Sequence, residues 1–147
     1  MITLRPVDRK NWISCCRLSV GDHQSGLVAS NLETIAESKF ENHYHLRAIY
    51  HNELVVGMLA YCHENDPENL ELYWIFRLMI DSAYQGKGFG LKAMNLAIGE
   101  MKTLGAIRIR TMYKPGNLIA ASLYEKLGFK LTGEILDDGD ILRELSL

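Results

Sequence analysis

The sequence has few cysteines, little net charge and no long hydrophobic run. Its three cysteines are an odd number, and Cys15 and Cys16 are adjacent, which suits neither a disulfide framework nor a zinc site. The formal net charge of -2 gives no basic footprint for nucleic acid. No segment approaches the length of a membrane span, and the N-terminus has no signal-peptide pattern. We therefore expect a cytoplasmic protein with reduced thiols and neither a nucleic-acid nor a membrane partner.

The sequence also shows no internal repeat, low-complexity segment or linker. Its 147 residues, 48% of them hydrophobic, are enough to bury one substantial core. We expect a single domain that spans residues 1–147. The five histidines have no metal-ligand spacing and are interpreted as scattered surface residues, so no metal site is expected.

Apolar periodicity and capping signals predict a mixed α/β (α+β) order of β-α-α-β-β-β-α-β-α-β-β. Ser30, three residues before Glu33, predicts the start of the second helix. Leu32, Ile35 and Phe40 belong to its predicted apolar stripe. The other predicted strands are residues 2–5, 46–50, 54–61, 70–81, 107–112, 129–136 and 141–147, and the other helices are residues 8–20, 89–104 and 117–127.

Three spaced glycines, Gly86, Gly88 and Gly90, join the predicted strand that ends at residue 81 to the helix that opens near Phe89. Glycines allow a ligand to approach the backbone, and a helix N-terminus offers unpaired N–H donors and a favourable dipole to an anion. The same spacing also fits a tight turn without a ligand. The third glycine of a Rossmann fingerprint and the Gly-Lys-Ser/Thr of a Walker loop are both missing, which disfavours dinucleotide and ATP binding.

These residues resemble a known superfamily. Residues 80–90 resemble the Gln/Arg-x-x-Gly-x-Gly/Ala signature of GNAT acetyltransferases. Residues 117–129 resemble the Asn-x-x-Ala-x-x-Leu-Tyr-x-x-x-Gly-Phe helix of the same superfamily. The two motifs occur in the expected order along the chain.

The resemblance implies the GNAT fold, in which a mixed central sheet flanked by helices splays after its fourth strand and holds the cosubstrate acetyl-CoA in the gap. The pantetheine arm would pair with the backbone of Leu78, Met79 and Ile80. Asn117 would contact CoA and also cap its helix. The pyrophosphate would rest on Gln85, Gly86, Lys87, Gly88, Phe89 and Gly90, in agreement with the helix-terminus argument.

For chemistry, the resemblance implies that Tyr124 protonates the departing CoA thiolate, although its helical spacing also fits a core aromatic residue. Glu71 is our candidate for the general base that deprotonates the amine, and a solvated carboxylate is the alternative. The resemblance implies direct attack of the amine on the thioester. In a rival mechanism, Cys62 would act as the nucleophile, although Cys62 also fits a small buried hydrophobic residue.

For the acceptor, residues 26–31 and 73–81 resemble bacterial spermine/spermidine (diamine) acetyltransferases. We therefore expect a polyamine such as spermidine, bound by Glu33, Glu37, Glu71 and Tyr73. The acidic residues equally fit a solvated surface. Acetylation of an aminoglycoside, an amino acid or a protein N-terminus, or a CoA-binding sensor without turnover, are alternatives. A homodimer is carried over from the resemblance as an expectation.

Overall fold

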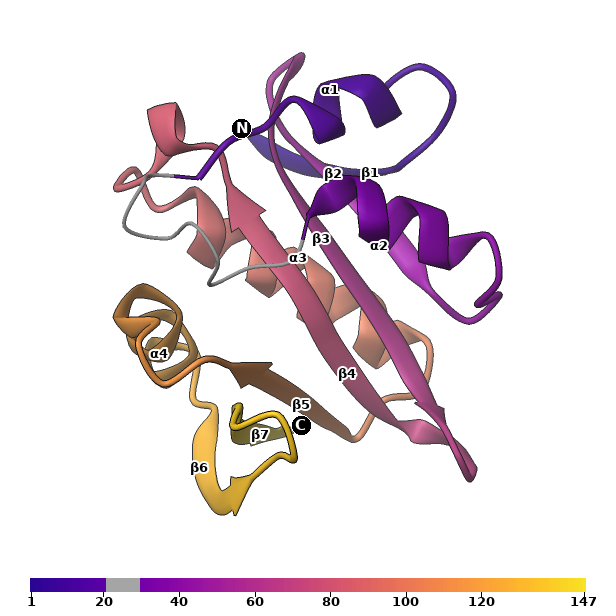
Figure 1. Ribbon diagram of the computed structural model, residues 1–147, viewed down its shortest axis with the longest axis vertical. Coiled ribbons are helices and arrows are strands. Elements are labelled where there is room, and N and C mark those ends of the chain that lie inside the picture. Colours follow the sequence, from indigo (N-terminus) through magenta and orange to yellow (C-terminus); the bar gives the residue numbers. More distant parts are fainter. Residues whose placement is uncertain (21–29) are drawn as a thin grey trace.

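The computed structural model describes residues 1–20 and 30–147 and confirms the predicted order of strands and helices (Figure 1). One short 3₁₀ helix, η2 (Ser82–Tyr84), is an addition to that order. The strands are β1 (Ile2–Pro6), β2 (His45–His51), β3 (Leu54–Asn65), β4 (Glu68–Ile80), β5 (Arg108–Tyr113), β6 (Lys130–Ile135) and β7 (Ile141–Ser146). The helices are α1 (Trp12–Cys16), α2 (Asn31–Ser38), α3 (Phe89–Thr103) and α4 (Leu118–Lys126).

The described strands form one mixed sheet in the order β1-β2-β3-β4-β5-β7-β6. All neighbouring strands are antiparallel except β4 and β5, which run parallel with α3 as the crossover between them. The strand β4 lies at the centre of the sheet, as the bulky, nearly continuous apolar residues within 70–81 predict.

The sheet opens where β4 and β5 separate. These strands pair only over residues 72–75 of β4, and the last pair is Ile75 with Thr111. A β-bulge follows at once, because the register with β3 shifts between Ala60 and Tyr61 and leaves Phe76 without an opposite residue. Beyond the bulge, β4 continues to Ile80 and pairs with β3 alone. One edge of this segment is therefore open, and the predicted splay after the fourth strand is confirmed (Figure 1).

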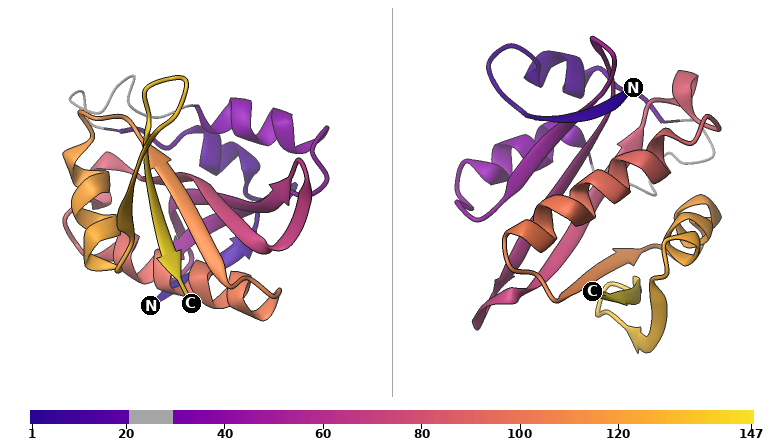
Figure 2. Two further views of the ribbon diagram at one scale, coloured as in Figure 1. Left: turned by 90° about the horizontal axis from the view of Figure 1, so that it is seen from below. Right: turned by 180° about the vertical axis from the view of Figure 1, so that it is seen from behind.

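Two groups of buried side chains cover the sheet. The helix α3 lies behind the sheet in Figure 1, while α1 and α2 lie in front of it, as the rotated views also show (Figure 2). The larger cluster joins α3 and α4 to the sheet through Met94, Met101, Ile109 and Tyr124. A smaller cluster centred on Met58 connects α1 and α2 to the sheet. The two faces of β4 therefore meet different helices.

The first helix is shorter than predicted. It ends at Cys16, whereas the apolar spacing predicted a helix through residue 20. Beyond it, the backbone N–H of Ser19 donates to Asp81 Oδ1 at 2.8 Å, and the Ser82 N–H donates to the Ser19 carbonyl at 2.6 Å. These contacts replace helical hydrogen bonds and attach the segment to the end of β4.

The second helix presents a different face from the one predicted. Leu32 and Phe40 were expected to be buried but are 57% and 79% exposed, while Asn31 and Thr34 are buried. The buried guanidinium of Arg77 beneath the helix requires a polar partner, which Asn31 supplies. The predicted cap is present, since Ser30 Oγ accepts from the Glu33 N–H at 3.1 Å.

Some predictions lie outside the described residues. Residues 21–29 include the exit expected directly after the first predicted helix, one of the five histidines, at position 23, and most of the motif at residues 26–31. Of the helices that the structure describes, none is both long and apolar enough to cross a membrane.

Candidate active site

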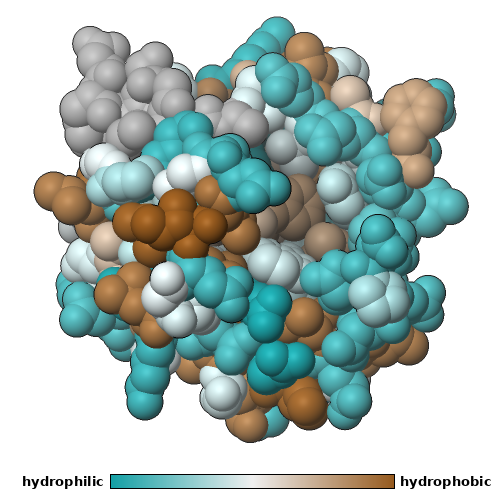
Figure 3. Space-filling model, turned by 60° about the horizontal axis from the view of Figure 1, so that its bottom comes forward, coloured by the Kyte–Doolittle hydropathy of each residue, from teal (hydrophilic) through white to brown (hydrophobic). Residues whose placement is uncertain are grey.

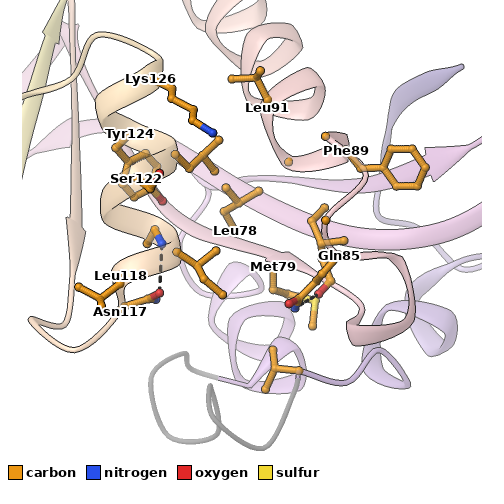
Figure 4. Close-up of a pocket in the computed structure, with 18 of the residues that line it drawn as sticks. Leu78, Met79, Gln85, Phe89, Leu91, Asn117, Leu118, Ser122, Tyr124 and Lys126 are labelled. Atoms are coloured by element: carbon orange, nitrogen blue, oxygen red, sulfur yellow. Dashed lines mark hydrogen bonds between the residues drawn. The ribbon is translucent and has the colours of Figure 1, made fainter.

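A cleft of about 580 Å³ follows the open edge of β4. Its walls come from the end of β4, the glycine turn and first residues of α3, and the facing side of α4 (Figure 4). Among the described residues, those that line it include Leu78, Met79, Ile80, Gln85, Gly86, Gly88, Phe89, Gly90, Asn117, Ser122, Tyr124 and Lys126. The sequence motifs at residues 80–90 and 117–129 therefore meet across one cavity.

The open edge of β4 supplies main-chain groups to this cleft. Leu78, Met79 and Ile80 pair with Leu59, Met58 and Gly57 of β3 in antiparallel register. In such a pair, alternate residues direct both N–H and C=O away from the partner strand. Because β5 has already separated, these groups face the cleft and can accept a strand-like ligand.

The glycine turn has the geometry of an anion cradle. Gly86 and Gly88 have φ angles of 78° and 79°, in the left-handed region that favours glycine. A Cβ at either position would meet no atom within 4 Å, so the space beside both is open. The helix α3 begins after Gly88 without a side-chain cap, which leaves its first N–H groups available to an anion.

Side-chain contacts hold the turn in place. Gln85 Nε2 donates to the Ile80 carbonyl at 2.9 Å and joins the turn to the end of β4. The ring of Phe89 packs on His51 at 4.7 Å and points away from α4, so its backbone rather than its ring faces the cleft (Figure 4). Lys87 is exposed and is not among the residues that line the cleft.

Two polar residues of α4 in the cleft were not predicted. Ser122 and Lys126 are one helical turn apart, and the Lys126 ammonium reaches toward the space between α4 and α3 (Figure 4). Lys126, rather than Lys87, is therefore the described cation that lines the cleft. The i, i+4 spacing of Ser122 and Lys126 on the motif helix was a signal available in the sequence.

Asn117 caps α4 and lines the cleft at the same time. Its Oδ1 accepts from the Ala120 N–H at 3.1 Å (Figure 4). The predicted capping role is therefore confirmed, and the side chain remains at the wall where a ligand would pass.

Tyr124 is 5% exposed and lies between the core and the cleft. Its ring packs between Tyr113 and Phe129, with centroid distances of 5.8 and 5.6 Å. Burial raises the pKa of Tyr124, and the nearby Thr111 hydroxyl opposes part of that increase. A neutral phenol at the cleft wall can donate a proton or a hydrogen bond, so both roles considered for Tyr124 are compatible with its position.

Comparison with known proteins agrees with this geometry. The family model for the acetyltransferase (GNAT) family matches residues 10–129. The chain belongs to the GNAT acetyltransferase family. It is therefore an acetyltransferase, and the cleft between β4 and α4 is its candidate active site.

Individual relatives of this acetyltransferase are distant. It is 27% identical over 144 residues to the spermine/spermidine N(1)-acetyltransferase of Bacillus subtilis, covering 95% of this chain and 94% of that protein. A crystal structure of the PaiA N-acetyltransferase of Thermoplasma acidophilum with coenzyme A matches at a TM-score of 0.76, with 19% identity and coverage of 100% and 99%. An aminoglycoside acetyltransferase with coenzyme A matches at 0.82, with 18% identity and coverage of 99% and 95%. The two structures show that the fold is shared.

On the opposite face of β4, the acetyltransferase buries a cation. Arg77 is 6% exposed, and its Nε and Nη2 both donate to Asn31 Oδ1, at 2.9 and 2.5 Å. Asn31 Nδ2 in turn donates to the Cys15 carbonyl at 2.8 Å. Burial lowers the pKa of Arg77 to about 10, and the charge of Glu33 opposes this shift. A polar contact between α1, α2 and β4 therefore lies behind the cleft.

Beside this contact, aromatic and acidic side chains surround the bulge. The rings of Tyr44 and Phe76 lie 4.6 Å apart. Burial raises the pKa of Tyr44, with a further increase from the charge of exposed Glu37. Seen from below, the molecule is hollowed near its centre, with hydrophobic side chains at the rim (Figure 3).

Two predicted acceptor residues lie elsewhere. Glu71 is exposed near the start of β4, seven positions before Leu78, or about 23 Å along an extended strand. Tyr73 is 4% exposed and packs in the core against Tyr61, with centroids 6.2 Å apart. The position of Glu71 gives no support to its predicted roles, and the ring of Tyr73 packs in the core. The sequence could not show which way these side chains point.

The histidines are less scattered than expected. The His43 and His63 rings lie 5.2 Å apart, and His45 stacks on Tyr61 at 4.9 Å. Burial lowers the pKa of His45, and the charge of Arg47 lowers it further. Within residues 1–20 and 30–147, no group of three or more His, Cys, Asp or Glu side chains is placed to hold a metal ion.

Proposed function

We propose that this GNAT acetyltransferase transfers the acetyl group of acetyl-CoA to a primary amine of a polyamine such as spermidine or spermine. The observation that carries this proposal is the similarity to the Bacillus subtilis spermine/spermidine N(1)-acetyltransferase, which extends over 95% of this chain and 94% of that protein. The similarity therefore extends over both the cleft beside β4 and the opposite face of that strand.

The donor half of the cleft fits acetyl-CoA by its chemistry. The uncapped N-terminus of α3 and the open space beside Gly86 and Gly88 suit a pyrophosphate. Each charge at such a helix end gains about 0.3 to 1 kcal/mol when exposed. The free edge of β4 suits the amide groups of pantetheine, and Lys126 suits a further phosphate. Acetyl-CoA complexes are also known among structures of this fold.

In the proposed reaction, the neutral amine attacks the thioester carbon directly. The nitrogen–carbon bond forms and the carbon–sulfur bond breaks. Tyr124 donates its phenolic proton to the departing sulfur, and the nitrogen loses its extra proton to water to give the amide. Transfer of a proton from a phenol near pKa ~10 to a thiolate whose conjugate acid lies near ~8.5 moves the negative charge from sulfur to the phenolic oxygen, and Tyr124 can also stabilise the thiolate by a hydrogen bond. Free N–H groups on β4 would polarise the carbonyl of the thioester.

The amine must lose a proton before it attacks. An alkyl ammonium with a pKa near ~10.4 costs about 4 to 5 kcal/mol to deprotonate at neutral pH unless its site shifts that pKa. None of the described residues that line the cleft is Asp, Glu or His. We therefore propose that this proton leaves to water on the open acceptor side of β4.

On that side, the pair of Tyr44 and Phe76 beside Glu37 supports a cationic acceptor. Aromatic faces attract an ammonium group by about 0.5 to 2 kcal/mol, and exposed carboxylates add a long-range attraction. Glu33 lies on the same exposed helix surface as Glu37, one turn earlier. The proposed acceptor site therefore retains Glu33 and Glu37 and replaces Tyr73 with Tyr44 and Phe76.

One observation favours a second candidate. Among the described residues, buried Arg77 has a neutral amide partner and no carboxylate within ion-pair distance. An acceptor amine that also carries a carboxylate, such as an amino acid, would supply a counterion to this guanidinium. Amino-acid acetylation is therefore the alternative that the same experiment must include.

The test is a CoA-release assay with acetyl-CoA and a panel of spermidine, spermine, putrescine, amino acids and aminoglycosides. We expect kcat/KM for spermidine or spermine to exceed that for every amino acid by at least about 10-fold. A preference for amino acids would reject the polyamine and support the role of Arg77 in the alternative.

A matched pair of variants locates the acceptor site. Glu37→Gln should raise KM for spermidine about 2- to 5-fold and leave KM for acetyl-CoA unchanged, because exposed ion pairs contribute about 0.2 to 1 kcal/mol. Glu134→Gln removes an equally exposed carboxylate from β6 and should change neither value. Equal effects of the two variants would indicate general electrostatic attraction without a local site.

A further inference from the structure

One buried polar residue lies at the point where the sheet divides. Along β5, alternate residues Ile109, Thr111 and Tyr113 are buried at 0%, 0% and 7% exposure. Thr111 is the polar member of this series. It forms the last β4–β5 pair with Ile75 and is opposite Arg143 of β7. Thr111 therefore lies at the apex of the gap that we propose holds acetyl-CoA.

The hydroxyl of Thr111 is unsatisfied. Its Oγ1 is buried and has no hydrogen-bond partner of full geometry within the described parts of the chain. Buried hydroxyl groups are otherwise paired in folded proteins, since an unpaired one is destabilising relative to an apolar group of the same shape. A requirement of packing alone would be met better by valine.

The phenol of Tyr124 is the group whose pKa the Thr111 hydroxyl affects. Tyr124 packs on Tyr113, the next inward residue of β5, with ring centroids 5.8 Å apart. The Thr111 hydroxyl lowers the pKa of Tyr124 against the larger effect of burial, which is the action of a donor directed at the phenolic oxygen. Thr111 Oγ1 nevertheless has no hydrogen-bond partner in the described chain, so the bond to the phenol is not formed there.

We infer that Thr111 is a positioning residue, whose hydroxyl completes a hydrogen bond to the Tyr124 oxygen when the phenol gives its proton to the CoA sulfur. This inference rests on the proposed role of Tyr124 as the proton donor. As the carbon–sulfur bond breaks, the phenolic proton moves to sulfur and negative charge appears on the phenolic oxygen. The Thr111 O–H donates to that oxygen, and the phenol later regains a proton from water.

The test compares Thr111→Val with Thr111→Ser in the complete chain. Valine keeps the shape and loses the donor, so kcat should fall about 10-fold while KM for acetyl-CoA stays within about twofold. Serine keeps the donor and should restore kcat to within about threefold of the wild type. Thermal unfolding should show Thr111→Val to be no less stable than the wild type, because it loses an unpaired hydroxyl.

A lower kcat without a loss of stability would distinguish a positioning role for Thr111 from a packing role. A purely structural Thr111 predicts an unchanged kcat for Thr111→Val, which would overturn the inference. Thr103→Val, on the exposed end of α3 and outside the cleft, is the matched control and should retain full turnover.

A double-mutant cycle separates this inference from the function on which it rests. If Tyr124 is the acid, Tyr124→Phe slows turnover, and adding Thr111→Val should slow it no further. Full activity of Tyr124→Phe would remove the proposed acid itself. A slow Tyr124→Phe variant with additive effects of Thr111→Val would leave the acid in place and reject the partnership.

Discussion

The two faces of β4 are built in different ways. On the donor side, the ligand surface is mainly main chain: the free edge beyond Ile75, the uncapped start of α3 and two left-handed glycines. On the acceptor side, the surface is made of side chains from distant segments, such as Tyr44, Phe76 and the pair Asn31–Arg77. The donor is one molecule, whereas acceptors differ, so a side-chain surface can vary without disturbing the other half.

This contrast predicts that substitutions on one face should change one substrate's kinetics and spare the other's. Tyr124 concerns both substrates in the proposed reaction, because it lies in the core at the wall of the donor cleft and would protonate the sulfur at the reacting bond. The first prediction therefore concerns Tyr124.

Tyr124→Phe should lower kcat by about 100-fold, the low end of the effect of a general acid, and change KM for acetyl-CoA by less than about threefold. The physical reason is that phenylalanine keeps the packing against Tyr113 and Phe129 but removes the proton. Steady-state kinetics and a direct acetyl-CoA titration measure the two quantities. Unchanged kcat would remove Tyr124 from the mechanism and leave it as a core aromatic residue.

The donor side could be predicted from the sequence because local physics determines it. Spaced glycines before a helix define a turn by their own dihedral freedom, and Asn117 caps its helix through the neighbouring Ala120 N–H. Even here, the spacing of Ser122 and Lys126 on α4 was a signal in the sequence, but the choice of Lys126 over Lys87 depends on how the helices face each other. Lys126 reaches the cleft because α4 faces α3 across the divided sheet, which is a tertiary fact.

The second prediction tests the polar support of the acceptor side. Asn31→Ala removes the partner of buried Arg77 and of the Cys15 carbonyl, so the free energy of unfolding should fall by about 2 kcal/mol. That corresponds to about 30-fold in the folding equilibrium constant. Urea denaturation measures it, with exposed Leu32→Ala expected within about 0.5 kcal/mol of the wild type. Equal stability of the two variants would contradict a supporting role for Asn31.

The buried face of α2 and the surroundings of Tyr73 depend on tertiary contacts, which the sequence does not show. The pattern of α2 pointed to Leu32 and Phe40 as its buried face, but Arg77, more than 40 positions along the chain, imposes a polar one. Tyr73 and Phe76 lie three positions apart on β4. The bulge at Phe76 interrupts the alternation of side chains between the two faces of the sheet. No local pattern in one sequence carries this information.

The third prediction returns to the donor side, where backbone conformation should matter more than side chains. Gly88→Ala places a Cβ on a residue with φ of 79° and costs about 1 to 2 kcal/mol of strain in the anion-binding turn. We expect KM for acetyl-CoA to rise about 10-fold and KM for the amine to stay within about twofold. Gly99→Ala, at an open position inside α3 with an ordinary helical backbone, is the control and should bind acetyl-CoA normally. A normal KM for Gly88→Ala would show that the turn does not hold the donor.

The smallest effect is expected from Cys62, which lies on β3 at the acceptor face and is the nucleophile of the rival mechanism. Burial, together with the charges of Glu64 and Glu41, raises the pKa of the Cys62 thiol to about 12. A thiol with this pKa is protonated at neutral pH and is a poor nucleophile. Cys62→Ala should therefore keep kcat within about twofold, with Cys16→Ala as the control on the more exposed thiol. A loss of turnover in Cys62→Ala, together with an acetylated Cys62 trapped in the wild type, would instead support the rival mechanism. The acetyl group would then pass through a residue on the acceptor face, and the two faces of β4 would not serve separate substrates.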